Sequence, residues 1–570
     1  MYESHSRPLD YRKFYNPDFV IKNIRVSQTA IFHEVITRMK RMIQLLDKLN
    51  LRQWQDKFLF LAIIFLIFDN IPKYLQLNFL SNGQSCKLTW YCLFIFLLLF
   101  GVRKVKENLF FTHEERKFLI YMLLYFLLLL ASNIMGIIQY PFYDDLLLGP
   151  ASQIEKLPNV IAFLQSFKID VSYETLLLSW IDLRSIKLGI FTVIYTFGFS
   201  FAIYYFIKNN WKQYITLLEK AIFISLGIIC LYSLVEVFYL AGNEMATAIL
   251  STVNPFLHPI AVDHNWWPPL LWKGQLRSVF SEPSRMGNYA AFILPFLWGR
   301  LVGKEKMQWK ILVVTVLYTF LIFLTKARTP IGIYWGMLVL FFAFGFGLGK
   351  KKFFKKALII LCISAASFSA SLFFINSFMV SKSQDTVTAS EYLEDNIGSL
   401  TSSNKRSNGA RYALIRSNLK TGIEHPILGV GDILTPSYTV ANFTENDLNN
   451  REVSMWVNDY YEQGPLKYDL DGMNEYVSQF AKHGLVGLLL FLFPGIYAIL
   501  GLLKKIKYAS GEQQRKIAVV LMSLIGTLVA GCNGSLTLLY TYWIILAYSY
   551  AIIFGTYQDS SVEELKKGAS

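Results

Sequence analysis

Twelve apolar runs, separated by loops that are alternately rich and poor in lysine and arginine, constrain this 570-residue chain more than any other feature. A helix needs about 20 apolar residues to cross a bilayer. The runs lie near residues 58–79, 88–102, 118–138, 187–207, 214–241, 288–303, 309–326, 331–349, 357–380, 484–503, 517–532 and 537–555. A chain with 54% hydrophobic and 17% charged residues has too little charge to cover a soluble surface of this size. The sequence therefore predicts an all-α integral membrane protein with about 12 transmembrane helices.

The net charge of +15 does not indicate nucleic-acid binding, because the positive residues lie in short segments beside the apolar runs. Lysine and arginine accumulate in the cytoplasmic loops of membrane proteins. The basic loops are residues 103–117, 208–212, 304–310, 350–356 and 504–516. We therefore expect these loops and both termini in the cytoplasm, and the loops 139–186, 242–287 and 381–483 on the outer side.

This assignment divides the chain into five segments. They are a basic amphipathic N-terminal segment (1–57), the first nine membrane helices (58–380), an extracytoplasmic cap loop (381–483), the last three membrane helices (484–555) and a cytoplasmic tail (556–570). Within the first segment, Ile31–Leu51 has the pattern of a helix that lies on the inner leaflet. Within the cap, Tyr412, Ile415, Leu419 and Ile423 recur at near-helical spacing, so we expect short helices there.

Several functional classes are disfavoured. The cytoplasmic segments contain neither a Walker A motif nor a dinucleotide fingerprint, which argues against an ATP-driven pump and against a transferase fed by cytosolic nucleotide sugars. The five cysteines have no metal-site spacing. Two outer acidic pairs, Asp144-Asp145 and Asp469 with Asp471, are short motifs more typical of solvated loops than of a divalent metal site.

Three polar segments at the outer ends of the apolar runs are candidates for chemistry. Arg277–Asn288 leads into a membrane span, Thr325–Pro330 is a tight turn between two spans, and Arg411–Gly431 lies in the cap. Guanidinium groups bind phosphate and carboxylate oxygens bidentately, so these arginines indicate an anionic, membrane-borne substrate. On a helix Arg411 and Arg416 do not share a face, so one could face the site while the other meets solvent.

These segments resemble the O-antigen polymerase and ligase superfamily, whose members build bacterial surface polysaccharides. The motifs that carry the resemblance are Arg277–Asn288, Lys326–Arg328 and His425–Gly431. Arg411 and Gly422 match the family's spacing of an arginine, ten residues and a glycine. The resemblance covers roughly residues 275–490 and implies a GT-C-like membrane fold.

A further segment from Asn474 to Leu490, with Gly484 and Gly487 within it, is similar to the family's passage from the outer loop into the next span. Family members often have a histidine just before the asparagine, whereas this chain has Met473. This difference leaves no histidine base at that position.

The resemblance implies glycosyl transfer from a lipid-diphosphate-linked glycan. An acceptor hydroxyl attacks the anomeric carbon and the lipid diphosphate leaves, so fixed arginines would stabilise the leaving group. The catalytic candidates are Arg277, Arg328 and Arg411, with Glu282 as the base, and the candidate substrate-binding residues are Arg285, Arg416, Asn474 and His425. No metal and no cofactor are then required. The alternative for each single arginine is an interfacial anchor that reaches lipid phosphates.

We therefore expect polymerisation of repeat units into a capsule, exopolysaccharide or O-antigen, on the outer face of the bacterial cytoplasmic membrane. The expected partners are the polyprenyl-diphosphate-linked donor and acceptor, the lipid bilayer, and a chain-length regulator and flippase of the same pathway, with no nucleic acid. One alternative is a ligase that moves finished glycan to another acceptor. The other is a transporter or flippase of lipid-linked glycan, which should show two matching halves or polar residues in the middle of its spans. The sequence has no evident internal repeat, and its polar motifs lie at one face instead of the midplane, which disfavours transport.

Overall fold

Every regular element that the computed structural model describes is a helix. The described residues are 50–81, 83–107, 110–147, 154, 156–259, 274–303, 308–347, 351–379, 387–396, 398, 406–468, 470 and 472–555. Within them, seven segments are long and apolar enough to cross a membrane, and one of these, Tyr173–Leu240, contains successive helices. The predicted all-α membrane class is therefore confirmed. The proposed amphipathic helix Ile31–Leu51 lies almost entirely outside the described residues.

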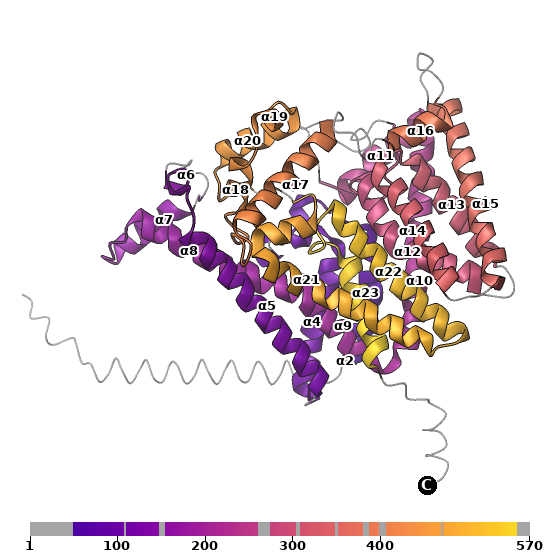
Figure 1. Ribbon diagram of the computed structural model, residues 1–570, viewed down its shortest axis with the longest axis horizontal. Helices are drawn as coiled ribbons and strands as arrows, with labels where there is room; N and C mark the ends of the chain where they lie inside the picture. The colour runs from indigo at the N-terminus through magenta and orange to yellow at the C-terminus, as the bar shows by residue number, and fades with distance from the viewer. Residues whose placement is uncertain are drawn as a thin grey trace, which may run out of the picture.

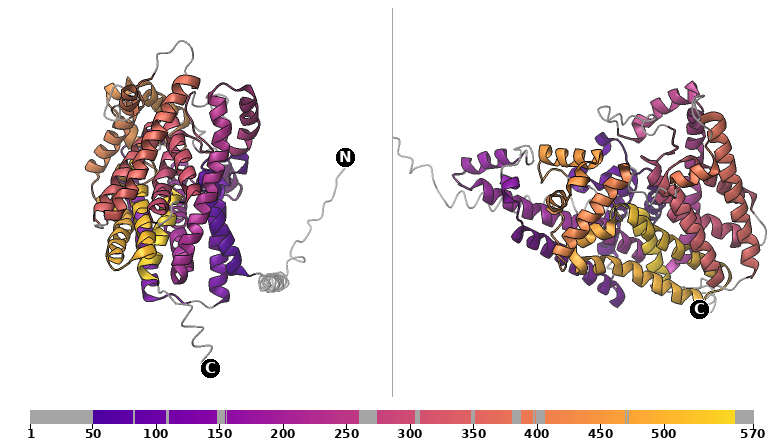
Figure 2. Two further views of the ribbon diagram at one scale, coloured as in Figure 1. Left: turned by 90° about the vertical axis from the view of Figure 1, so that its right-hand side faces the viewer. Right: turned by 45° about the horizontal axis from the view of Figure 1, so that its top comes forward.

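A helix occupies at least part of each of the twelve predicted spans, and the long helices run side by side (Figure 2). They are α2 (Leu51–Ile64), α4 (Leu88–Lys106), α5 (His113–Ile138), α8 with α9 (Tyr173–Val193 and Phe199–Ile207), α10 (Trp211–Leu240), α12 (Pro283–Gly303), α13 (Trp309–Leu324), α14 (Arg328–Gly347), α15 (Lys351–Phe374), α21 (Glu475–Lys507), α22 (Gly511–Ala530) and α23 (Tyr540–Phe554). The apolar runs thus locate the helices of the bundle, although not all of their ends.

The predicted first span, 58–79, is wrong in its bounds. The helix α2 begins at Leu51, because the Asn50 side chain accepts a hydrogen bond from the Gln53 amide at 3.1 Å and caps the helix. After a 3-10 turn at Phe65–Ile67 the chain leaves the helix, and Pro72 lacks the amide that a helix would need. Two further 3-10 turns and the short helix α3 (Asn78–Ser81) follow before α4.

The predicted outer loops also contain helices. The loop 139–186 holds α6 (Tyr143–Leu147), α7 (Leu157–Ser166) and the first half of α8, and the loop 242–287 holds α11 (Glu244–Leu257). In Figure 1, α6 and α7 lie beside the start of α8, at the left edge of the bundle. These segments therefore extend the helical structure beyond the predicted spans.

Charged residues near the ends of α5, α10, α12 and α22 pair at one end of the bundle, here named the basic end. Lys208 pairs with the buried carboxylate of Glu115, which links α5 to the segment before α10. Arg300 and Arg515 both bind the fully buried Glu219, each with an N–O distance of 2.9 Å, and so join α10, α12 and α22. Basic residues of two predicted cytoplasmic loops and of the helix α12 are thus paired with buried carboxylates at this end.

The opposite end carries five short helices within the described part of the loop 381–483, and we name it the cap end (top of Figure 1). They are α16 (Ala389–Asn396), α17 (Arg406–Glu424), α18 (Thr435–Ala441), α19 (Glu445–Leu448) and α20 (Arg451–Gln463). The helical spacing noted from Tyr412 to Ile423 corresponds to α17, although both of these side chains are exposed on it.

A break in α21 receives the segment His425–Gly431. At Gly484 the backbone has φ +64°, and the Leu485 amide donates to the carbonyl of Pro426 at 2.7 Å. On the other side of the break, the Val430 and Gly431 amides donate to the carbonyls of Ala481 and Lys482 at 3.1 and 2.8 Å. The helix therefore does not begin at 484 as expected. It begins at Glu475, and its unpaired carbonyls hold the cap loop.

We predict that Gly484→Ala destabilises the protein. A Cβ at this position would lie 2.6 Å from the Leu428 amide nitrogen, and an L-residue in the left-handed region costs a further ~1–2 kcal/mol. The midpoint of thermal inactivation of the detergent-solubilised protein should fall clearly. Gly227→Ala in α10 is the matched control, because its Cβ would meet no atom within 4 Å. Equal midpoints for the two variants would show that the break is not required.

The orientation of the two ends stays a prediction that labelling can test. Asn446 in α19 and Tyr508 after α21 are both exposed, at the cap end and the basic end respectively. In a background without the five native cysteines, Asn446→Cys should react with an impermeant maleimide on intact spheroplasts. Tyr508→Cys should react only after lysis. Labelling at 508 from outside would reverse the orientation and move the site to the cytoplasm.

Candidate functional site

Residues 531–539, which join α22 to α23, contact several segments that are far apart in the sequence. Asn533 accepts a hydrogen bond from the Arg411 guanidinium and donates to the Thr329 hydroxyl at 2.9 Å. The Leu536 amide donates to the Glu475 carboxylate at 2.9 Å. This connection, here named the 531–539 loop, therefore brings the starts of α14 and α21 together with α17 of the cap.

Arg328 and Arg411, two of the predicted catalytic residues, lie close together beside this loop. Arg328 is the first residue of α14 and donates to the side-chain oxygen of Asn408, at the start of α17. Burial, and then the nearby positive charge of Arg328, lower the pKa of Arg411, while Glu452 and Glu282 act in the opposite direction. Two positive charges repel each other in a partly desolvated site, and a bound anion would reduce this repulsion.

Glu282, the predicted base, is half-buried near this pair. Its carboxylate accepts a hydrogen bond from the Ser284 hydroxyl at 3.0 Å, and its charge acts on Arg411. The structure thus brings together Arg328, Arg411 and Glu282.

Arg277, the third predicted catalytic arginine, lies in a different environment. It is only 3% exposed, and the carboxylate of Glu236 on α10 accepts hydrogen bonds from the Arg277 and Ser278 amides at 3.0 and 2.6 Å. Within the described residues its Nη2 has no hydrogen-bond partner. Burial, and then the charge of Arg277, lower the pKa of His258 to about 4, so this neighbouring imidazole is neutral near pH 7.

Asp69 anchors the rest of the Arg277–Asn288 segment. Its carboxylate accepts hydrogen bonds from the Ser281 amide and hydroxyl, both at 2.8 Å, and lies 3.9 Å from Nε of Arg285. Sequence reasoning missed Asp69, because it lies inside the predicted first span. An acidic residue in an apolar run is itself a signal of a buried partner, and here that partner is the loop before α12.

Arg416, His425 and Asn474, three predicted substrate-binding residues, have local structural partners. Arg416 is 55% exposed on its side chain and pairs with Asp447. Burial would raise the pKa of Asp447, but its hydrogen bonds with Arg416 and Thr444 lower it overall.

The imidazole Nδ1 of His425 lies 2.9 Å from the amide oxygen of Gln139, and Asn474 caps α21 by accepting from the Tyr476 and Val477 amides. These contacts place both residues in the packing of the cap end. Because Asn474 caps α21, its presence at this position does not require a ligand.

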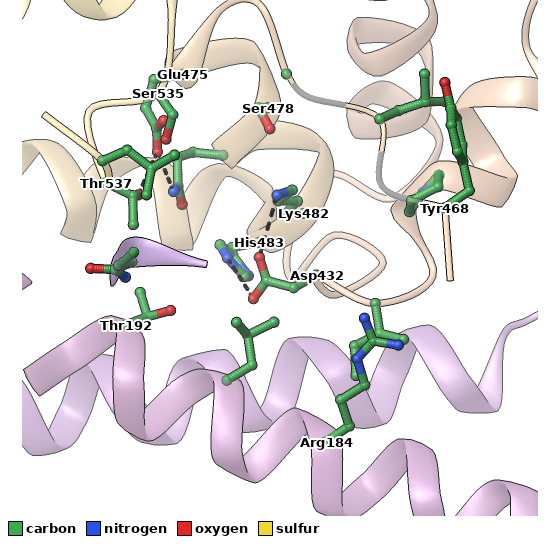
Figure 3. Close-up of a pocket in the computed structure, with 18 of the residues that line it drawn as sticks. Arg184, Thr192, Asp432, Tyr468, Glu475, Ser478, Lys482, His483, Ser535 and Thr537 are labelled. Carbon is green, nitrogen blue, oxygen red and sulfur yellow. Dashed lines mark hydrogen bonds and ion pairs between the residues drawn. The ribbon is translucent and has the colours of Figure 1, made fainter. Parts of the chain in front are cut away.

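A polar cavity of about 200 Å³ lies between α8, α21 and the cap loop (Figure 3). In this cavity the Asp432 carboxylate lies between Lys482 and His483. One of its oxygens is 3.5 Å from Nζ of Lys482, and the other is 3.6 Å from Nε2 of His483. Glu475, Ser535 and Thr537 line the same space. The signal that could have found this cavity is the Lys482-His483 pair, which directly precedes the apolar run 484–503.

No metal centre is found in the part of the chain that the structure describes, where no three His, Cys, Asp or Glu side chains are grouped closely enough to hold an ion. Of the acidic pairs noted in the sequence, Asp469 and Asp471 lie outside the described residues, and so does the side chain of Asp144.

We predict that Glu236→Gln destabilises the Arg277 loop. Glutamine offers one acceptor oxygen instead of two, so one buried amide would face an NH₂ group, at a cost of about 1–3 kcal/mol. The thermal midpoint of the purified protein should fall. Glu244→Gln, on the exposed first turn of α11, is the control and should leave the midpoint unchanged. An unchanged midpoint for both variants would mean that the carboxylate does not hold the loop.

Comparison with known protein families identifies the segment that contains much of this site. Residues 311–492, about one third of the chain, match the family model described as O-Antigen ligase. The match includes Arg328, Arg411 and the break in α21, while Arg277 and the 531–539 loop lie outside it. No curated protein matches the sequence. The match confirms the resemblance of this part of the chain to the O-antigen polymerase and ligase superfamily.

Proposed function

We propose that this protein polymerises lipid-diphosphate-linked oligosaccharide repeat units into a bacterial surface polysaccharide, on the outer face of the cytoplasmic membrane. The observation that carries the proposal is the partly buried pair of Arg328 and Arg411, which hydrogen-bonds to the neutral amides of Asn408 and Asn533. These amides orient the two guanidinium groups beside each other. A diphosphate carries the charge and the paired oxygens that two guanidinium forks bind.

In this mechanism the hydroxyl of an acceptor glycan attacks the anomeric carbon of the donor. The bond from that carbon to the diphosphate oxygen breaks, and the lipid diphosphate leaves with the electron pair. Negative charge grows on the leaving group, and the prearranged arginines stabilise it more in the transition state than in the bound donor. Glu282 is placed beside Arg411, on the leaving-group side, so we assign it the role of orienting this arginine.

Arg277 and Arg285 have a supporting role in this proposal. Arg277 is buried beside Glu236. Arg285, on the first turn of α12, lies near Asp69. Together these contacts fix the segment that carries Glu282. The donor and acceptor are polyprenyl-diphosphate-linked glycans, and a chain-length regulator and a flippase of the same pathway are proposed as protein partners.

A ligase that transfers finished glycan to a different acceptor is the second candidate, because the matched family model is described as O-Antigen ligase. A deletion strain separates the two on a gel of its surface glycan. Loss of a polymerase leaves single repeat units on the usual acceptor. Loss of a ligase leaves long chains on the carrier lipid. Accumulation of repeat units on the inner leaflet would instead indicate a flippase.

We predict that Arg328→Lys and Arg411→Lys each lower the rate of polymer formation by about 10²–10³-fold. Lysine keeps the charge and the ability to anchor at the interface, but it cannot bind two phosphate oxygens with a planar fork. The measurement is polymer formed per amount of membrane-inserted protein. Arg116→Lys, an exposed arginine at the basic end, is the control. Wild-type polymer levels in both cap-end variants would show that these arginines are only anchors.

We predict that elongation by the purified protein continues when EDTA replaces divalent cations, because the arginines supply the positive charge at the leaving group. The assay follows the length of glycan made from a polyprenyl-diphosphate-linked repeat unit. A strict requirement for magnesium or manganese would contradict this mechanism, and it would direct attention to Asp145 or to Asp469 and Asp471.

A further inference from the structure

We propose that the polar cavity beside α21 binds the acceptor sugar, and that His483, oriented by Asp432, accepts the proton of the attacking hydroxyl. This inference rests on the proposed function and adds to it the site of the second substrate. Four observations support it: the position of the cavity, its lining, the geometry of His483, and the direction from which the hydroxyl must attack.

The cavity is adjacent to the arginine pair. Ser535 and Leu538 line it, and Asn533 of the same loop binds Arg411. Two residues of even a fully extended chain span only about 7 Å, so the cavity wall at Ser535 lies within that distance of Asn533, measured between Cα atoms. A donor held by Arg328 and Arg411 would therefore have its reacting end close to this cavity.

The lining matches the chemistry of a sugar. A sugar hydroxyl both donates and accepts hydrogen bonds, and the cavity offers both functions through Ser478, Ser535, Thr537 and Asp432, with the Tyr125 ring as an apolar surface. Its volume of about 200 Å³ is below the 300–1,000 Å³ that is usual for drug-sized ligands, so it would take one sugar unit and not a whole repeat.

The break in α21 holds His483 in this cavity. His483 is only 1% exposed, and its Nδ1 has no hydrogen-bond partner among the described residues, while Nε2 lies 3.6 Å from an Asp432 oxygen. The Asp432 amide in turn donates to the Asn133 side chain at 3.0 Å, directly after Gly431, whose φ is +75°. Because Nδ1 is enclosed by protein, the ring meets the cavity through the edge that carries Nε2, and a substrate hydroxyl beside Asp432 would contact this nitrogen.

The direction of attack favours His483 over Glu282. In an in-line displacement the nucleophile approaches the anomeric carbon from the side opposite the leaving group. Glu282 acts on Arg411, which holds the leaving diphosphate, whereas His483 lines the cavity across the 531–539 loop. As the acceptor oxygen bonds to the anomeric carbon, its proton passes to the imidazole and the electron pair of the broken bond leaves with the diphosphate. Asp432 stabilises the imidazolium, which then loses its proton to water.

The test compares elongation with diphosphate binding in the purified full-length protein. Elongation uses a polyprenyl-diphosphate-linked repeat unit, and binding is read as the rise in thermal midpoint on adding polyprenyl diphosphate. His483→Gln should lower elongation by about 10²–10⁴-fold and leave the rise in midpoint unchanged. Asp432→Asn should lower elongation by about 10²-fold, the lower end of this range. His113→Gln, at the exposed start of α5, is the matched control for both readouts.

Chemical rescue separates a base from a packing residue. In His483→Ala, added imidazole should restore elongation in proportion to its free-base concentration, because the vacated space is part of the cavity. Elongation by His483→Gln within threefold of wild type would overturn the inference. The inference would also be overturned if His483→Gln lost both elongation and the rise in midpoint and imidazole did not rescue His483→Ala. His483 would then act by maintaining the fold. The proposed function fails separately, if the wild-type protein does not elongate the donor.

Discussion

The docking of His425–Gly431 into the break of α21 fixes the position of the cap on the membrane helices. A broken membrane helix leaves backbone carbonyls without intrahelical partners, and these must be satisfied by protein groups where water is scarce. Here the Val430 and Gly431 amides bind two of them, and the Leu485 amide binds the carbonyl of Pro426. Because α17 ends immediately before this segment, the same contacts set the position of Arg411.

Arginines at the cap end and at the basic end include different kinds of side chain among their partners. At the basic end, Arg300 and Arg515 form ion pairs with the buried Glu219. At the cap end, Arg328 and Arg411 donate hydrogen bonds to the side-chain amides of Asn408 and Asn533. Ion pairs with a buried carboxylate link helices of the bundle, whereas two arginines held close together by amide groups are suited to an anionic ligand.

Much of the membrane architecture could be predicted from the sequence, because apolar length and loop charge are local properties. The near-helical spacing from Tyr412 to Ile423 is also a local property, and it lies within α17. Asp69 and His483 were missed because their roles depend on residues that are distant in the sequence or that meet only in the fold. Asp69 binds Ser281, which is 212 positions away, and no local pattern specifies such a contact. Asn474 shows the reverse case, since its cap on α21 is a local signal that was interpreted as substrate binding.

The central claim is that the cap-end arginines assist the departure of a lipid diphosphate as each glycosidic bond forms. The most direct measurement gives the purified protein polyprenyl-diphosphate-linked repeat units as the sole substrate and quantifies both products. The account predicts glycans that lengthen by whole repeat units, with one polyprenyl diphosphate released for each new bond. Polymer without this release, or synthesis only after a nucleotide sugar is added, would contradict it.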